Sequence, residues 1–202
     1  MPRFIGDVHG KFGQYKTIIK QYPDTIQVGD MGIGFRRWPH GECSENPPYD
    51  AMVASNARFI RGNHDNPTVS RRHTQWIPDG HIENDMMFVG GAFSIDFKYR
   101  VESFSWWPDE ELSHEEMLWI YDIYMKHKPR MMVTHNCPDC IVPYIHTHHY
   151  GFTSRTGQLF DRLFEEHKPQ IWVHGHHHIS VDHEVLGTRF VCLAELEHKV
   201  IE

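Results

Sequence analysis

Short apolar runs that end in glycine and a polar residue recur along the 202-residue chain. Residues 3–5, 25–28 and 57–61 are such runs, and they lead into Gly-Asp, Gly-Asp and Gly-Asn. Residues 131–134 and 171–173 are two more runs, and each leads into a histidine. Apolar runs of this length, bounded by turn residues, are typical of buried strands. We therefore expect strands whose carboxyl ends present polar side chains to one region of the protein.

Apolar residues at helical spacing separate these runs and predict the helices of the fold. Ser113 followed by Glu116 forms a capping-box pattern, so we expect a helix that begins there and ends at Lys128, before Pro129. Other helices are expected at residues 12–22, 49–56 and 157–167. Strands that alternate with helices predict an α/β layered fold.

Two glycine-containing segments predict β-hairpins. Residues 86–89 and 92–95 are apolar runs divided by a Gly-Gly pair, and residues 180–193 contain two runs that turn near Gly187. Each segment is expected to form a pair of antiparallel strands.

The composition is that of a soluble globular protein. Hydrophobic residues make up 40% of the chain and charged residues 23%, and no apolar run approaches the roughly 18 residues that span a bilayer. The length fits a single domain over residues 1–202. The first motif begins too early to leave room for an export signal, and four scattered cysteines do not suggest a disulfide scaffold. We therefore expect a cytoplasmic protein that does not associate with membranes.

Seven polar residues follow the predicted strands and belong to types that bind metal ions. Asp7 and His9 are two positions apart, as are His174 and His176, so each pair can direct both side chains to one side of an extended chain. The full set is Asp7, His9, Asp30, Asn63, His135, His174 and His176. Seven ligands exceed the four of a tetrahedral zinc site but suit two metal ions that share a carboxylate. Asp30 is the natural bridge.

The order of the motifs GDVHG, GD, GNHD, TH and HGHHH resembles that of the calcineurin-like metallophosphoesterase superfamily, over residues 6–176. The resemblance implies an α/β fold in which a β-sandwich of mixed sheets is flanked by helices, in four αββα layers. It also implies two divalent metal ions. One ion would be held by Asp7, His9, Asp30 and His176, and the other by Asp30, Asn63, His135 and His174. Manganese (Mn²⁺), iron (Fe²⁺ or Fe³⁺) and zinc (Zn²⁺) all suit such mixed ligands.

The reaction that the resemblance implies is hydrolysis of a phosphate ester. Two divalent ions lower the pKa of a bridging water, supply hydroxide in line with phosphorus and neutralise the transition state. His64 resembles the general acid of the family, and Asn63 and His64 are expected to bind the phosphoryl group. We expect a phosphomonoesterase acting on a phosphorylated small molecule, protein or nucleotide. Two alternatives stay open: a phosphodiesterase acting on cyclic nucleotides or nucleic acid, and a metal-binding scaffold of the same fold without turnover.

The chain departs from the protein phosphatases of this superfamily after the second motif. Those enzymes usually carry an aspartate and an arginine there, whereas this chain has Ile33 and Gly34. Arg36 or Arg37, slightly further on, could contact phosphate through a shift of the loop, and a solvated loop is at least an equal alternative. Arg61 needs no catalytic role.

Further histidines and cysteines surround the last two motifs. His177 or His178 could enter the metal site, although positions outside it are favoured. An irregular zinc-binding pattern is formed by Cys137, Cys140, His146, His148 and His149. Its spacing is not that of a regular zinc knuckle, and ordinary thiols in a loop are the favoured interpretation.

Overall fold

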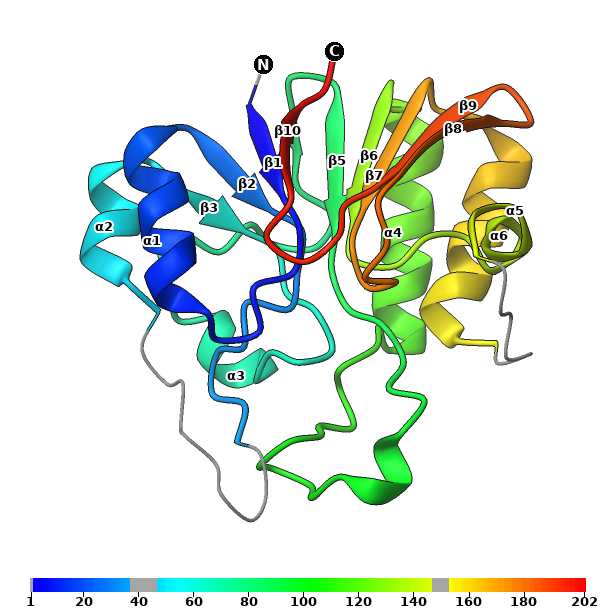
Figure 1. Cartoon of the computed structure of the whole chain (residues 1–202). Helices are drawn as coiled ribbons and strands as arrows, with labels where there is room; N and C mark the ends of the chain where they lie inside the picture. The colour runs from blue at the N-terminus through cyan, green and yellow to red at the C-terminus, as the bar shows by residue number, and fades with distance from the viewer. Residues whose placement is uncertain (1, 37–46, 147–152) are drawn as a thin grey trace.

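The computed structural model describes residues 2–36, 47–146 and 153–202, and two β-sheets lie at its centre (Figure 1). In this part of the chain, one sheet has the strand order β10-β1-β2-β3 and the other β4-β5-β6-β7-β9-β8. The first sheet contains β1 (Arg3–Ile5), β2 (Thr25–Gln27), β3 (Arg58–Phe59) and β10 (His198–Val200). The second contains β4 (Ile82–Glu83), β5 (Met86–Val89), β6 (Met131–Thr134), β7 (Ile171–His174), β8 (Val181–Val185) and β9 (Thr188–Cys192).

Helices cover the outer faces of the two sheets, as Figure 1 shows. On the side of the first sheet lie α1 (Phe12–Gln21) and α2 (Tyr49–Ala54), and on the side of the second lie α4 (His114–His127) and α6 (Arg155–Glu166). The short helices α3 (Pro67–Ser70) and α5 (Val142–Ile145) occur in connections. The sequence of layers confirms the predicted α/β fold with two mixed sheets flanked by helices.

Alternating strand residues divide the hydrophobic core into layers, because neighbouring side chains of a strand point to opposite faces of its sheet. In β7, Ile171 and Val173 pack between the two sheets together with Phe4 of β1. Trp172 instead packs on the outer face, where its ring contacts Phe160 of α6 edge-on. This alternation also decides the direction taken by the polar residues at the strand ends.

Helix α4 begins and ends as its sequence predicts. The Ser113 hydroxyl accepts the Glu116 backbone N–H and the Glu116 carboxylate accepts the Ser113 N–H, so both halves of the capping box are present. At the other end Lys128 adopts the left-handed conformation, with φ 45°, and its N–H donates to Tyr124 O. Pro129 then prevents continuation of the helix.

One of the two predicted hairpins forms and the other does not. β8 and β9 pair antiparallel across the turn at Gly187, as predicted. Residues 92–95 form no strand, and β5 pairs antiparallel with β4 and parallel with β6. The first glycine of the Gly-Gly pair is needed for close packing rather than for a turn, because a Cβ on Gly90 would lie 2.5 Å from Arg61 O.

The parallel strands place their carboxyl ends at one edge of each sheet. β1, β2 and β3 are mutually parallel, as are β5, β6, β7 and β9. β10, which the sequence patterns did not predict, pairs antiparallel with β1. In the described residues, no helix has the length and hydropathy needed to cross a membrane.

Candidate metal centre

The loops that follow β1, β2 and β7 bring four ligand-type side chains together. The ligand atoms of Asp7, His9, Asp30 and His178 lie within 4.8 Å of one another. His9 Nε2 lies 3.7 Å from both Asp7 Oδ2 and Asp30 Oδ2. His178 Nε2 lies 3.0 Å from Asp7 Oδ2 and 2.9 Å from His9 Nε2. Two carboxylates and two imidazoles therefore converge.

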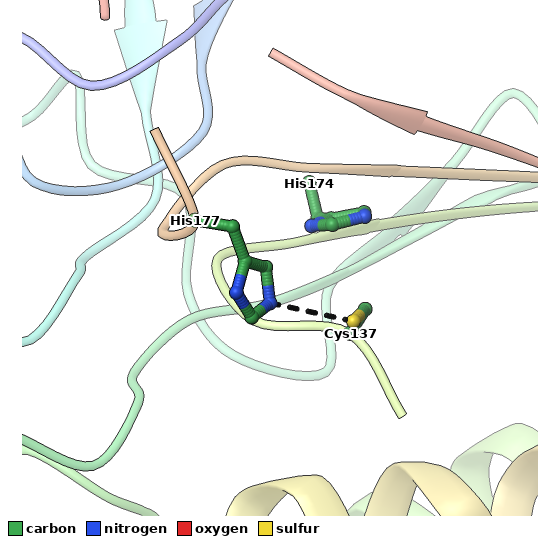
Figure 2. A group of neighbouring side chains, drawn as sticks. All are labelled: Cys137, His174 and His177. Atoms are coloured by element: carbon green, nitrogen blue, oxygen red, sulfur yellow. Dashed lines mark hydrogen bonds between the residues drawn. The ribbon is translucent and has the colours of Figure 1, made fainter. Parts of the chain in front are cut away.

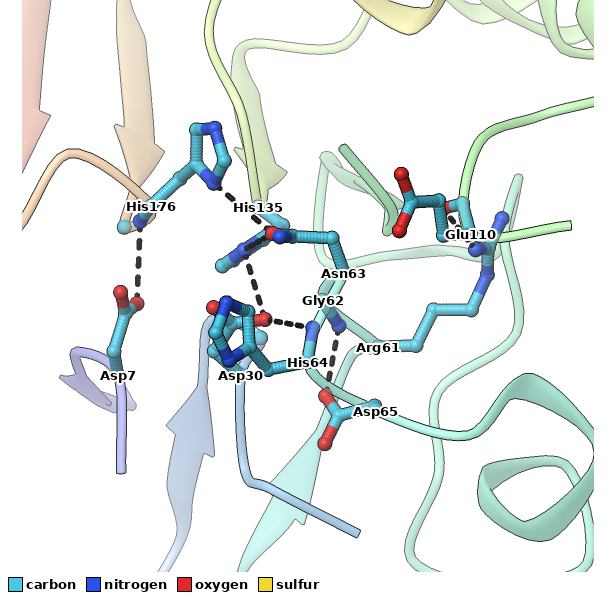
Figure 3. Close-up of polar contacts among 12 residues, drawn as sticks. Asp7, Asp30, Arg61, Gly62, Asn63, His64, Asp65, Glu110, His135 and His176 are labelled. Carbon is cyan, nitrogen blue, oxygen red and sulfur yellow. Dashed lines mark hydrogen bonds and ion pairs between the residues drawn. The ribbon is translucent and has the colours of Figure 1, made fainter. Parts of the chain in front are cut away.

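A second group of side chains shares Asp30 with the first. The ligand atoms of Asp30, His135 and His176 also lie within 4.8 Å of one another. His135 Nε2 lies 3.2 Å from Asp30 Oδ1 and 3.1 Å from Asn63 Oδ1, and His176 Nδ1 lies 3.1 Å from the same Asn63 oxygen (Figure 3). Asp30 thus stands between two clusters of oxygen and nitrogen atoms.

Four of these residues have a backbone conformation that is unfavourable for any residue with a Cβ. His9, Asp30, His176 and His178 have φ values of 47°, 57°, 67° and 55°. Such left-handed residues cost on the order of 1–3 kcal/mol each when they are neither glycine nor locally stabilised, and they gather at functional sites. Four of the twelve non-glycine residues with positive φ among the described residues thus lie at this site.

Glycines beside the site make room for the neighbouring carboxylates. A Cβ on Gly62 would lie 2.1 Å from Asp30 Oδ1 and 2.8 Å from His135 Nε2. A Cβ on Gly175 would lie 2.3 Å from Asp7 Oδ1. Because real side chains do not approach this closely, the Gly-Asn and Gly-His steps are required by packing around the site as well as by the turns.

Buried charge determines the protonation of these side chains. Asp7 and Asp30 are 0% and 1% exposed. Burial acts to raise their pKa values, but surrounding imidazoles lower the pKa of Asp7 to about 2 and that of Asp30 well below its ordinary value. Burial acts to lower the pKa of His135, yet Asp30 and Asp7 raise it to about 9. Without bound metal, a protonated His135 balances part of the negative charge of the two carboxylates, and a metal ion bound at Nε2 would displace that proton.

The donor atoms fit divalent metal ions. Asp7 Oδ2 is buried, and among the described residues no group forms a well-oriented hydrogen bond to it. His135 Nδ1 lies 2.9 Å from Val28 O, a contact in which the ring donates its Nδ1–H and directs Nε2 into the cluster. Metal-binding histidines are commonly oriented in this way. A mixed set of carboxylate, amide and imidazole donors suits manganese, iron or zinc.

His64 borders the centre without belonging to either group. Its backbone N–H donates to Asp30 Oδ1 over 2.7 Å, and its ring stacks on Phe35 with centroids 4.6 Å apart. Arg100 Nη2 lies 2.7 Å from His64 Nε2, so the guanidinium donates and the imidazole accepts. Burial, together with the Arg100 charge, lowers the pKa of His64 to about 4 against the opposing effect of Asp30.

A pocket of about 330 Å³ opens in front of these groups. Asp30, Asn63, His64 and Arg100 form part of its wall. Other lining residues include the polar Ser94 and Asp96 as well as Phe93, Ile95, Val142, His176 and His178. The pocket therefore joins the candidate metal ligands to an imidazole and a guanidinium.

A protein-family model covers most of the chain. The model described as calcineurin-like phosphoesterase matches residues 3–180. The chain belongs to this family. As a calcineurin-like phosphoesterase it is a metal-dependent phosphoester hydrolase, which confirms the predicted superfamily and reaction class.

Solved structures share the fold of this calcineurin-like phosphoesterase at low sequence identity. The protein TT1561 of Thermus thermophilus superimposes with a TM-score of 0.58 and 10% identity, over 96% of this chain and 90% of that protein. A putative 5′-nucleotidase from Staphylococcus aureus gives a TM-score of 0.52 and 12% identity, over 96% of this chain but 48% of its own. At these identities the likeness establishes the fold alone. A search of curated proteins gives no match.

The structure separates one predicted ligand of the phosphoesterase from the other six. His174 is the last residue of β7, where alternation places its side chain on the same face as Trp172. Its ring lies with Cys137 and His177, and it belongs to neither group around Asp30. The structure therefore does not bring His174 beside Asn63, where it was expected. The run HGHHH contains the two-residue spacing of histidines twice, so spacing alone could not choose between the pair His174 and His176 and the pair His176 and His178.

Among the described residues, the arginine that lines the pocket is Arg100, and neither the sequence motifs nor the loop after Asp30 pointed to it. Arg100 lies in the segment between β5 and α4, and no motif in the sequence marks it. The Arg36 side chain is exposed and its guanidinium lies 5.7 Å from the centre of the Phe104 ring, while Arg37 is outside the described residues. Arg61 is fully buried and forms an ion pair with Asp79, which agrees with a packing role.

Two buried carboxyl groups near the site were not singled out from the sequence. Asp65 accepts the backbone N–H groups of Gly62, Gly32 and Ile33 at 2.8, 2.7 and 2.9 Å, and so fastens two ligand-bearing loops to each other. In the sequence, Asp65 is marked only by its place as the last residue of the Gly-Asn-His-Asp motif.

Ser94 links Asn63 to the second of these carboxyl groups, that of Glu110. Asn63 Nδ2 donates to Ser94 Oγ over 3.1 Å, and Ser94 Oγ donates to Glu110 Oε2 over 2.6 Å. Because the Asn63 amide nitrogen is held by Ser94, its carbonyl oxygen is the atom that faces His135 and His176.

Proposed function

We propose that this calcineurin-like phosphoesterase is a phosphomonoesterase with two divalent metal ions bound on either side of Asp30. The observation that carries the proposal is that two groups of converging donor atoms share this one carboxylate at the wall of a pocket. In the proposal Asp7, His9, Asp30 and His178 hold one ion. Asp30, Asn63, His135 and His176 hold the other.

The assignment differs from the sequence-based one in the last motif only. His176 moves to the second ion, and His178 takes the place that His176 had at the first. Support comes from the distances to Asp7 and Asn63 and from the left-handed backbone of both histidines. His174 has no role in this centre.

The protein residues around the ions bind and orient the substrate. When bound, a pair of divalent ions lowers the pKa of a water and neutralises phosphoryl oxygens. Arg100 offers a guanidinium that binds phosphoryl oxygens through charge-assisted hydrogen bonds. His64, 2.7 Å from Arg100 Nη2, lies where it can contact the same group. To protonate the leaving oxygen, its neutral ring must first take up a proton, which a bound phosphoryl group favours because its negative charge attracts Arg100 and raises the pKa of the imidazole. Phe35 supports the His64 ring by stacking.

The pocket favours a small phosphate monoester. Its volume of about 330 Å³ is at the lower end for ligand sites, which commonly span roughly 300–1,000 Å³. Phe93, Ile95 and Val142 supply apolar wall, which suits a compact organic group attached to phosphate. A nucleoside monophosphate is one such substrate to test, because a structure of similar fold is described as a putative 5′-nucleotidase.

Turnover by purified protein tests the proposal. The protein is loaded with Mn²⁺, Zn²⁺ or iron and assayed on an aryl phosphate monoester, an aryl phosphate diester, a 2′,3′-cyclic nucleotide and a nucleoside 5′-monophosphate. We expect the monoesters to be hydrolysed fastest, and His64→Ala to reduce kcat by about 10²–10⁴-fold, as loss of general acid catalysis does. His114→Ala, at an exposed position of α4, is the matched control.

The other outcomes of this panel contradict the proposal in distinct ways. Preference for the diester or the cyclic nucleotide would identify a phosphodiesterase built on the same centre. Absence of turnover with every metal would indicate a metal-binding scaffold without hydrolytic activity.

A further inference from the structure

A second kind of metal-binding cluster lies on the other side of the histidine-rich loop. Cys137, His174 and His177 each offer a ligand atom, and the three atoms lie within 4.8 Å of one another (Figure 2). Cys137 follows β6, His174 ends β7, and His177 lies in the loop between the proposed ligands His176 and His178. The cluster shares no residue with the groups around Asp30.

One of the three donor separations in this cluster matches that of a tetrahedral zinc site. With Zn–S of about 2.3 Å and Zn–N of about 2.0–2.1 Å, a tetrahedral angle places sulfur and nitrogen about 3.6 Å apart. Cys137 Sγ and His177 Nε2 are 3.5 Å apart, as the dashed line in Figure 2 shows. The observed separation therefore needs little change for both atoms to bind one ion.

His174 provides an observation of its own that points to a ligand. The residue is 0% exposed, and its Nε2 has no hydrogen-bond partner among the described residues. Its Nδ1 lies 3.1 Å from Gly175 O, which can accept the Nδ1–H. Coordination through Nε2 would satisfy both ring nitrogens at once, because an outer hydrogen bond on the second nitrogen is the usual arrangement of a metal-bound imidazole.

The cluster is closed on one side and open on the other. Cys137 and His174 are buried, whereas His177 is partly exposed and lines the pocket of about 330 Å³. A water molecule entering from the pocket would complete a tetrahedral set with these three protein ligands. Cys140, which the sequence grouped with Cys137, is exposed and lies outside the cluster.

We propose that Cys137, His174 and His177 bind one additional metal ion of the kind that prefers thiolate and imidazole, with Zn²⁺ as the best match. Binding releases the thiol proton of Cys137 to solvent and forms a sulfur–metal bond. The ion ties the segment after β6 to the loop after β7. These are the two segments that carry His135 and the pair His176 and His178, so the ion stabilises the framework of the hydrolytic centre without taking part in hydrolysis.

Cobalt substitution separates this site from the proposed hydrolytic centre. Co²⁺ bound by a cysteine thiolate gives an intense charge-transfer band in the near ultraviolet, and the ligands proposed around Asp30 include no sulfur. We expect this band in the Co²⁺-loaded wild-type protein, its loss in Cys137→Ser, and its retention in Cys140→Ser. His177→Ala is expected to weaken or abolish it. Elemental analysis is expected to show one equivalent of metal fewer in Cys137→Ser.

X-ray absorption at the zinc edge of wild-type protein gives a measurement that needs no variant. A sulfur neighbour at about 2.3 Å is expected. Absence of both the cobalt band and the sulfur neighbour in wild type would overturn the proposal, as would a band that survives Cys137→Ser. Either result can occur with full phosphomonoesterase activity, and loss of activity in Asp30→Asn can occur with an intact band, so the two proposals fail separately.

Discussion

The histidines of residues 174–178 lie in two different environments, one on each side of the loop after β7. His176 and His178 turn toward two buried carboxylates, and both have left-handed backbone. His174, still in the strand, and His177 turn toward the thiol of Cys137. Neighbouring residues of the same type thus meet different partners because the backbone changes from strand to turn between them.

The two environments differ in charge as well as in donor type. The side around Asp7 and Asp30 concentrates negative charge in a buried place, which calls for compensation by cations. The side around Cys137 brings a thiol together with imidazoles, and a thiol binds metal only by giving up its proton. Carboxylate-rich sites suit ions that act on phosphate, whereas cysteine-containing sites suit tightly held zinc. Five predictions test whether the side around Asp7 and Asp30 and the side around Cys137 have these different roles.

Asp30→Asn should give the largest effect, because Asp30 is the residue that the two carboxylate-side groups share. The change removes a negative charge between the two proposed ions, and we expect kcat/KM to fall on the order of 10³-fold or more. The thiolate-to-cobalt band should stay. Steady-state assays on an aryl phosphate monoester measure the effect, with Asp122→Asn on the exposed face of α4 as control. A loss below tenfold would remove Asp30 as the bridge.

His178→Ala and His174→Ala compare the two sides directly. His178 Nε2 is 3.0 Å from Asp7 Oδ2, so its loss should lower kcat/KM by roughly 10²–10³-fold, more than the 10–100-fold typical of an outer partner. His174→Ala should reduce activity less and abolish the cobalt band. Both variants are measured under saturating Mn²⁺ with circular dichroism to verify folding. If His174→Ala lost more activity than His178→Ala, the sequence-based assignment of His174 as a ligand of the second ion would be favoured.

The position of a site residue could be predicted from the sequence where local contacts determine it, and could not where tertiary contacts do. Asp7, Asp30 and Asn63 follow strands at Gly-Asp or Gly-Asn turns, so local pattern was enough to bring them to one edge. The choice between His174 and His178 depends on where β7 ends and the chain turns, which the repeated histidine spacing does not encode. Arg100 comes from a segment of irregular structure and reaches His64 only through the tertiary fold.

The β-structure shows the same limit. The run 86–89 was correctly predicted as a strand, but its partners are β4 and β6 rather than residues 92–95. The Gly-Gly pair looked like a turn, whereas Gly90 is required by the close approach of Arg61. A short apolar run between turn residues can identify a strand, but it does not identify the strands that pair with it, because pairing is a long-range contact.

Arg100→Ala tests whether the guanidinium at the carboxylate side binds the phosphoryl group. Loss of one charged donor that acts on the transition state should lower kcat/KM by about 10²-fold. Arg100→Lys should recover part of the loss, since a lysine supplies charge without the planar fork. Arg36→Ala is the matched control and tests one of the two arginines, Arg36 and Arg37, that the sequence offered. If Arg36→Ala gave the larger loss, phosphate would be bound by the loop after β2.

Ser94→Ala should reveal how firmly the oxygen of Asn63 is held toward the metal. Without the Ser94 hydroxyl, the Asn63 amide can rotate and present nitrogen in place of oxygen to His135 and His176. We expect the Mn²⁺ concentration for half-maximal activity to rise about tenfold, as for other outer partners of metal ligands. Ser180→Ala, at an exposed position, should not change it. An unchanged Mn²⁺ requirement in Ser94→Ala would mean that Asn63 is oriented by packing alone.

Glu110→Gln should have the smallest effect of the five changes. We expect it to alter the stability of the protein rather than its turnover. It tests the buried carboxyl group that Ser94 links to Asn63. Glu110 is 2% exposed, and burial raises its pKa from 4.5 to about 7 despite the hydrogen bonds from Ser94. Between these pH values the folded protein holds a proton that the unfolded chain releases. The free energy of unfolding must therefore fall as pH rises through this window and level off above it.

Glutamine cannot titrate, so Glu110→Gln should flatten this pH dependence. Urea unfolding of metal-free protein across the window measures it, and Glu115→Gln at an exposed position of α4 should keep the wild-type slope. An equal slope in Glu110→Gln and wild type would assign the pH dependence to other groups. A flattened slope would show that the buried carboxyl group of Glu110, which Ser94 links to Asn63, titrates in this window.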